Sequence, residues 1–266
     1  MTTVVPPHRI AGADLLAPIT STLRAMFGTD DLPGLTPGLV VPELSTARWS
    51  TANDLIDGSR LPALLDSAKL RWQASPHAAA ALAWKAYTYW LSLPVVLGWA
   101  SARRVPLLYP NDVMMHFEDR RPLLTLGFRR SVAVAVLPSD PLALSGLPQV
   151  RVMQDEAALL GALRASLLDA HLNPLLDAIH QEVRVGARTL LGSVSSGIAH
   201  GILRAADVLP GSTVEHIGTL LTTLGVEDLI ELVPGPNGDL AVQRKTCCLA
   251  FTLPQPKICT GCCIKP

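Results

Sequence analysis

The sequence predicts a mostly helical α+β protein: a helical body with a small antiparallel sheet, followed by a short cysteine-rich C-terminal module. Three observations predict this class. Apolar residues recur at three- and four-residue spacing over most of the 266 residues. Between residues 107 and 138 this pattern gives way to short runs rich in Val, Leu and Phe, as in strands. Finally, all five cysteines lie between residues 247 and 263.

Composition narrows the function classes. Hydrophobic residues make up 49% of the chain and charged residues 17%, so a chain of this length can bury a large core. The formal net charge is zero, so no general attraction to nucleic acid is encoded and we expect no nucleic-acid partner. Residues 1–13 lack the features of a secretory signal, which predicts a cytoplasmic protein.

The first hundred residues are expected to be helical. Apolar spacing predicts a helix over residues 14–27, two short helices between residues 51 and 72, and a long helix over residues 76–101. Pro76 suits the start of the long helix, where the missing amide proton has no partner to lose. Residues 28–42 are rich in Pro and Gly and predict a loop.

One segment raises the question of a membrane. Residues 86–102 contain no charged side chain, but they reach only the lower limit of a membrane span and include Pro94. A buried core helix is therefore the prediction. The alternative is peripheral association with the inner face of the membrane, through Tyr87, Tyr89 and Trp90.

The strand-like runs cover residues 113–117, 123–128 and 131–137, and they predict the antiparallel sheet. Helical spacing resumes over residues 155–207. Asn173 and Pro174 predict a new helix that runs to about residue 191, and Gly192 predicts a break after it.

The last elements lead to the cysteines. Ser212 and Glu215 form a capping-box pattern that begins a helix, and Gly225 ends it. Residues 229–233 and 239–244 are expected to form two strands, the second of which leads directly to Cys247.

The cysteine spacing favours an iron–sulfur cluster over two other chemistries. Cys247 and Cys248 are adjacent, and Cys259 and Cys262 form a C-x-x-C pair with Cys263 directly behind it. A disulfide framework gains little from cysteines confined to one tail. Structural zinc needs two chelating pairs, and an adjacent pair suits it poorly. A cluster with several irons tolerates a vicinal pair combined with a C-x-x-C pair.

The C-terminal sequence resembles the motif of the FhuF-type ferric-siderophore reductases. It reads R-K-T-C-C-L-A-F-T-L-P over residues 244–254 and C-T-G-C over residues 259–262. The resemblance covers roughly the last tenth of the chain, and upstream it extends only to a helical body of similar length. The chain departs from the family pattern at Cys263, because proline usually follows the last ligand.

This resemblance implies a [2Fe–2S] cluster, with Cys247, Cys248, Cys259 and Cys262 as its ligands. It also implies an oxidoreductase that reduces a hydroxamate or catecholate ferric siderophore in the cytoplasm and releases Fe(II). Hard oxygen ligands hold Fe(III) much more tightly than Fe(II), so one electron is enough to release the metal. No nicotinamide-binding, phosphate-binding or serine-hydrolase motif occurs, so we expect an external electron donor such as a ferredoxin or a reductase.

Cations among the cysteines predict a docking surface. Arg244, Lys245 and Lys257 would favour the reduced cluster and attract an anionic chelate or an acidic donor protein. The plain alternative is a solvated basic tail.

The expected organisation is a substrate-binding body over residues 1–235 and a cluster-binding module over residues 236–266. Two other functions stay open at this point. An iron–sulfur electron carrier or a redox or iron sensor could use the same cluster without reducing a ferric chelate. A zinc-stabilised interaction module would be colourless and redox-silent.

Overall fold

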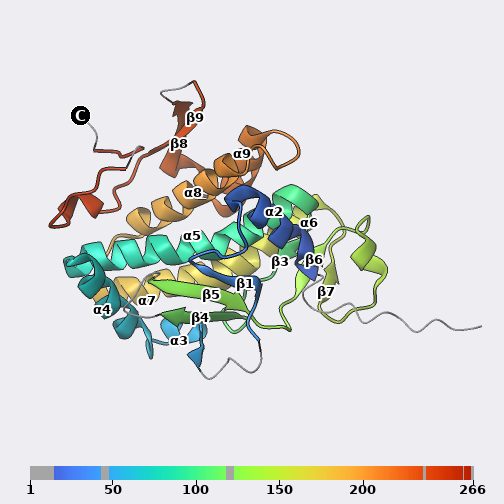
Figure 1. Cartoon of the computed structure of the whole chain (residues 1–266), viewed down its shortest axis with the longest axis horizontal. Helices are drawn as coiled ribbons and strands as arrows, with labels where there is room; N and C mark the ends of the chain where they lie inside the picture. Colours follow the sequence, from blue (N-terminus) through green and yellow to red (C-terminus); the bar gives the residue numbers. More distant parts are fainter. Residues whose placement is uncertain (1–14, 43–47, 118–122, 236–237, 260, 265–266) are drawn as a thin grey trace, which may run out of the picture.

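One central helix organises the fold. The structure is a computed structural model that describes residues 15–42, 48–117, 123–235, 238–259 and 261–264. Helix α5 (Pro76–Ala102) lies at its centre (Figure 1). Of its 27 residues, 18 are buried, so the helix is apolar on all sides and other elements must cover each side. The Ser75 hydroxyl caps its start by accepting a hydrogen bond from the amide of Ala78.

Helices pack on α5 from several directions. Those in direct contact with it include α2 (Ala17–Phe27), α4 (Leu61–Trp72), α7 (Asn173–Val183) and α8 (Ala187–Arg204). Figure 1 shows α8 and α9 on one side of α5 and the four-stranded sheet on the other. The remaining helical segments are α3 (Asn53–Ile56), η2 (Pro141–Leu144), α6 (Glu156–Leu163), the π-helical η3 (Arg164–Leu172), α9 (Thr213–Leu224), η4 (Glu227–Leu229) and η5 (Ala250–Thr252).

The described strands form three small sheets. The four-stranded sheet has the order β1-β5-β4-β2, the three-stranded sheet β3-β6-β7, and the last sheet is the hairpin β8-β9. β1 runs parallel to β5 and β6 parallel to β7, whereas the other pairs are antiparallel. The bounds are β1 (Leu35–Val40), β2 (Ser50–Thr51), β3 (Val105–Pro106), β4 (Val113–Phe117), β5 (Leu124–Phe128), β6 (Val134–Val136), β7 (Val150–Val152), β8 (Ile230–Pro234) and β9 (Leu240–Arg244).

The mostly helical α+β class is confirmed, but the sheet differs from the prediction in two places. The antiparallel pairing of β4 with β5 is as expected, whereas the third predicted strand, β6, belongs to another sheet. The predicted loop over residues 28–42 contains β1. Leu35 and Leu39 are buried there, and Pro37 is tolerated because β1 lies at the edge of its sheet.

The second helical region also differs from the prediction. No new helix starts from a cap at Asn173, because α6, η3 and α7 follow one another without interruption. The break comes at residues 184–186, where Arg184 takes a left-handed conformation with φ +56°. Gly192 does not end a helix: it lies inside α8 and is buried, since another segment packs against it.

Other predictions are confirmed. Helices α3, α4 and α5 form as expected, and the Ser212 hydroxyl accepts the hydrogen bond of the Glu215 amide at the start of α9. Within the described ranges, no helix combines the length and the apolar character needed to cross a membrane. Residues 1–13, which bear on the secretory signal, lie outside the described residues.

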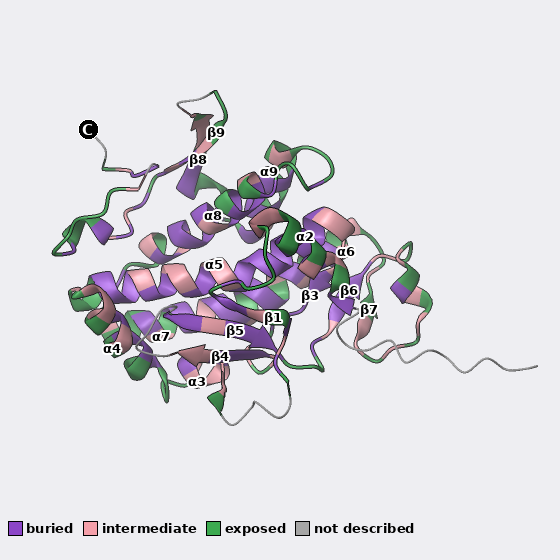
Figure 2. Cartoon of the chain, viewed as in Figure 1, coloured by how far each residue is buried: buried purple, intermediate pink, exposed green. Residues whose placement is uncertain are grey.

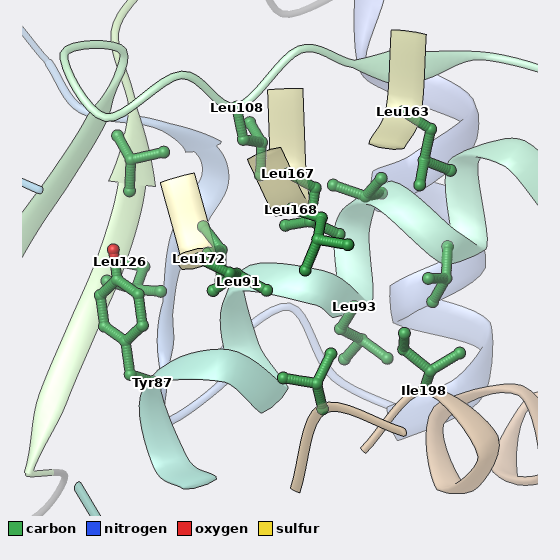
Figure 3. Close-up of a cluster of buried hydrophobic side chains, with 14 of the residues drawn as sticks. Tyr87, Leu91, Leu93, Leu108, Leu126, Leu163, Leu167, Leu168, Leu172 and Ile198 are labelled. Carbon is green, nitrogen blue, oxygen red and sulfur yellow. The ribbon is translucent and has the colours of Figure 1, made fainter. Parts of the chain in front are cut away.

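A buried polar pair fastens α5 to η3 within the apolar core. Figure 3 shows Tyr87 of α5 among leucines from η3 and from the sheet. Figure 2 shows buried residues along α5 and β5. The Tyr87 hydroxyl lies 2.6 Å from His171 Nε2, and His171 Nδ1 lies 2.7 Å from the Leu108 carbonyl oxygen. A carbonyl can only accept, so Nδ1 carries the proton and the tyrosine donates to Nε2. The pair is therefore satisfied with a neutral imidazole.

This arrangement predicts a dependence of stability on pH. Burial lowers the pKa of His171 from 6.5 to about 4, so the unfolded chain binds the proton more readily. The contribution of the neutral ring is complete above pH 6.5 and is lost as the pH falls toward 4, by up to about 1.4 kcal/mol per pH unit. Urea unfolding at several pH values should show this slope, and His171→Gln should remove it while lowering stability overall. Equal slopes for both proteins would contradict the assignment.

Candidate functional site

The chain after β9 folds back on itself and returns to the end of that strand. The amide of Arg244, the last residue of β9, donates to the carbonyl oxygen of Gly261 at 2.9 Å. The Gln243 side chain donates to the carbonyl oxygen of Cys262 at 3.0 Å. These bonds bring the C-x-x-C segment back beside the strand that leads into Cys247. The chain after Arg244, here called the tail, therefore forms a loop that closes on β9.

Local hydrogen bonds shape the tail. The Cys262 amide donates to the Cys259 carbonyl oxygen at 3.1 Å, so the C-x-x-C pair spans one tight turn. The Lys257 amide donates to the Ala250 carbonyl oxygen at 3.0 Å and closes the loop that contains η5. The Lys245 amide donates to the Leu229 carbonyl oxygen at 3.0 Å, which anchors the start of the tail to the end of η4.

Two glycines allow the tail to lie against its support. A Cβ on Gly192 of α8 would stand 1.8 Å from the Thr246 hydroxyl oxygen, so only glycine admits Thr246 at this place. A Cβ on Gly261 would stand 1.7 Å from the Val242 carbonyl oxygen, so glycine is also needed where the C-x-x-C turn meets β9. The position of the thiols therefore depends on close packing against both α8 and β9.

All five cysteines are free, and they influence one another. Burial raises the pKa of Cys259, and the neighbouring sulfurs of Cys248 and Cys262 raise it further. Burial also raises the pKa of Cys263, and the neighbouring thiols of Cys247 and Cys262 raise it further. Negative charge on one of these thiols therefore disfavours ionisation of the next, and a bound metal centre would offset this effect.

The chemistry of these donors fits an iron–sulfur cluster, but their arrangement is not that of a closed site. Soft sulfur ligands gather here, and the Leu249 amide donates to Cys247 Sγ at 3.3 Å, the kind of bond that tunes cluster thiolates. Within the described ranges, no three cysteine, histidine or acidic side chains form a group that could hold a metal ion. Binding of a cluster would thus require the sulfurs to draw closer together. Cys263 is close enough to Cys247 and Cys262 for their charges to raise the pKa of its thiol.

A cavity of about 370 Å³ adjoins the thiols. It lies between α5, α8 and the tail, and Cys259 and Gly261 contribute to its wall. Lys85 of α5 and Arg244 of β9 also line it, and their charges favour the thiolate form of Cys259. The other lining residues are Trp72, Leu82, Ala86, Tyr89, Ser193, Ser196, Gly197 and His200.

The three predicted docking cations lie in different places. Arg244 is only 3% exposed and lines the cavity, so it is not part of a solvated tail. Lys257 is exposed and lines a second hollow on the other side of Trp72, together with Arg71. Lys245 is exposed and lines neither hollow. Of these three cations, Arg244 is thus the one that lies next to the thiols, and it is buried.

The cavity residues that the sequence analysis did not predict lie at helical spacing on two helices. On α8 they occur at positions 193, 196, 197 and 200, and on α5 at positions 82, 85, 86 and 89. Both series follow the spacing of one helix face. Three of the α8 residues are small (Ser193, Ser196 and Gly197), which leaves room for a cavity beside α5. The signal that could have found this face is a polar and small stripe, with Lys85 and His200, on helices that are otherwise apolar.

The predicted division at residue 235 falls within the hairpin β8-β9. β8 precedes that division and β9 follows it, and the two strands pair from Ile230 with Arg244 to Pro234 with Leu240. The body and the thiol tail therefore share one sheet.

Comparisons with known proteins give a fold and no family. No protein-family model matches the chain, and no curated protein matches it. In structure it is similar to the ATP-bound aerobactin synthetase IucA from a hypervirulent pathotype of Klebsiella pneumoniae, at 14% identity and a TM-score of 0.54, over 91% of this chain and 49% of that chain. A second structure of that synthetase gives 14% identity and 0.53, over 90% and 50%. The chain spans about half the length of these structures, and the likeness shows the fold alone.

The contact at Gly192 predicts how the tail can be displaced. Gly192→Ala should push Thr246 away from α8, lower the free energy of unfolding by about 1–3 kcal/mol, and expose the buried Cys248 and Cys262. Rates of reaction with a thiol reagent, measured on the reduced, metal-free chain, should rise severalfold. Gly218→Ala in α9 is the matched control, because nothing lies within 4 Å of its Cβ. Identical thiol rates in the two variants would show that the tail does not depend on this contact.

Proposed function

We propose that this chain is a ferric-siderophore reductase that holds a [2Fe–2S] cluster through Cys247, Cys248, Cys259 and Cys262. The observation that carries the proposal is the return of the C-x-x-C turn to the end of β9, beside the adjacent cysteine pair and beside a cavity. The resemblance of the tail to the FhuF-type motif points to the same chemistry. The fold likeness to aerobactin synthetase, an enzyme of siderophore biosynthesis, supports a siderophore-associated role.

The chain's own residues provide a sheltered ligand set with one side open. Cys248 and Cys262 are buried, so protein covers their sulfurs, whereas Cys259 lies at the wall of the cavity. The Leu249 amide bond to Cys247 would stabilise negative charge on that sulfur. When bound, a [2Fe–2S] cluster would supply one-electron exchange at this place.

The reaction needs positioning and an electron, and no bond of the siderophore has to break. One electron converts Fe(III) in the chelate to Fe(II), which hard oxygen ligands hold weakly, so the metal leaves and the intact siderophore remains. The electron comes from an external donor, such as a ferredoxin or a reductase. The cavity beside Cys259 and the second hollow beyond Trp72 offer the chelate a face on which to dock.

The first test concerns the cofactor. Protein purified without oxygen should be red-brown, contain iron and acid-labile sulfide in about equal amounts, and show a paramagnetic signal only after reduction. Serine at any of the four proposed ligand positions should abolish or alter the spectrum, whereas Cys263→Ser should keep the iron and sulfide content. A colourless protein with stoichiometric zinc would refute the cluster. Loss in Cys263→Ser together with retention in Cys262→Ser would move the fourth ligand by one position.

The second test concerns the reaction. Chemically reduced protein, mixed without oxygen with a ferric hydroxamate or catecholate siderophore and a ferrous chelator, should reoxidise while the ferrous complex appears. Absorbance at two wavelengths follows both events, and the siderophore without protein is the control. A protein that stays reduced against every siderophore class, yet is oxidised rapidly by a partner protein, would be an electron carrier.

A further inference from the structure

The cavity beside Cys259 is positively charged and contains no acid. Lys85 and Arg244 both line it, and no aspartate or glutamate does. Neither cation has an acidic partner within 4 Å among the residues that the structure describes. The charges of both cations add to burial in lowering the pKa of His200, which lies on the same wall. The field inside the cavity therefore favours an anion.

Arg244 is the stronger sign of a missing partner. Its side chain is almost fully buried, and Nη2 donates to the Ser193 hydroxyl at 3.1 Å. Nε and Nη1 are buried without any hydrogen-bond partner in the described chain. A buried guanidinium with unused donors costs several kcal/mol unless a counter-charge compensates it. No described carboxylate supplies that charge, so the sources left are the Cys259 thiolate, which Arg244 favours, and an anionic ligand in the cavity.

The cavity around the two cations has the size of a small-ligand site, and its walls are mainly apolar. The cavity holds about 370 Å³, within the range of small-ligand sites. Ser193, whose hydroxyl accepts the Arg244 hydrogen bond, lines it together with Tyr89, Ser196 and Trp72. Because Arg244 is almost fully buried, a charge pair that it forms in the cavity is screened less than one on the surface.

We propose that this cavity binds the carboxylate group of an anionic ferric chelate, with Arg244 and Lys85 as its charge partners. The identity of the ligand as a ferric chelate rests on the proposed function, whereas the anion site rests on the cavity itself. The cavity volume is that of a small ligand, so it would admit one anionic arm of such a chelate and not the whole complex. The substrate class is therefore carboxylate-bearing chelates, in preference to neutral or cationic trihydroxamates.

The test measures binding without electron transfer. Gallium(III) complexes replace the ferric ones, because gallium is not reduced under these conditions, and titration calorimetry gives the Kd. Gallium citrate should bind, and the cationic gallium complex of a linear trihydroxamate should bind at least about tenfold more weakly. Lys85→Gln and Arg244→Gln should each weaken the binding of gallium citrate by about tenfold or more.

Lys245→Gln is the matched control, because it removes the same charge from an exposed position next to Arg244 that does not line the cavity. It should change the Kd by less than about twofold. Circular dichroism establishes whether each variant is folded, and Lys85→Gln, which leaves β9 intact, remains informative if Arg244→Gln does not fold. If Lys245→Gln weakens the binding of gallium citrate as much as Lys85→Gln does, the binding comes from general surface charge and not from the cavity. That result would overturn the proposal.

Two further arms separate this inference from others. Inorganic phosphate that binds as tightly as citrate and competes with it would make the cavity a phosphate site, and the assignment to a carboxylate would be wrong. Because the gallium complexes report binding alone, carboxylate binding in a protein that lacks a cluster would leave the anion site standing while the reductase proposal fails. If the protein releases iron from a siderophore but Lys85→Gln and Arg244→Gln leave the Kd of gallium citrate unchanged, the reductase proposal stands and the anion site is refuted.

Discussion

The structure depends on a helix that must be covered on every side. α5 carries apolar side chains around its whole circumference, so its burial supplies a large part of the hydrophobic free energy of folding. α8 is held to it by the hydrogen bond from the Trp84 indole to the Leu190 carbonyl oxygen, at 2.8 Å. α8 in turn carries Gly192, against which the thiol tail lies. The place of the cysteines thus follows, in three steps, from the need to bury α5.

The same helix pair that forms the core also forms the cavity. Where α5 and α8 carry large apolar residues, they close over the interior, and where they carry Ala86, Ser193 and Gly197, they leave space. Burying a charged side chain destabilises the fold unless a counter-charge or hydrogen bonds compensate it. Lys85 and Arg244 both line this space. The architecture therefore combines a rigid support with a polar opening, and the opening lies next to the sulfurs.

Local sequence patterns predicted most of the helices but few of the residues that line the cavity. Apolar spacing and the cap at Ser212 located helices correctly, because these features act over a few residues. Gly192 was misread as a break, since its reason lies 54 positions away, at Thr246. β1 was missed because its apolar residues are interrupted by Pro37 and Gly38 and only pairing with β5 orders them. Arg244 was assigned to a basic surface, and only the tertiary fold shows that it is enclosed.

The hairpin β8-β9 has a consequence for how this chain could be taken apart. A fragment that begins at residue 236 would carry every thiol, but it would leave behind the strand that pairs with β9, the Leu229 carbonyl that anchors Lys245, and the seat on α8. Transferred alone to another protein, the cysteine segment would therefore lack the contacts that hold its shape. Its shape depends on contacts with β8, η4 and α8, so an engineered fragment has to include these supports.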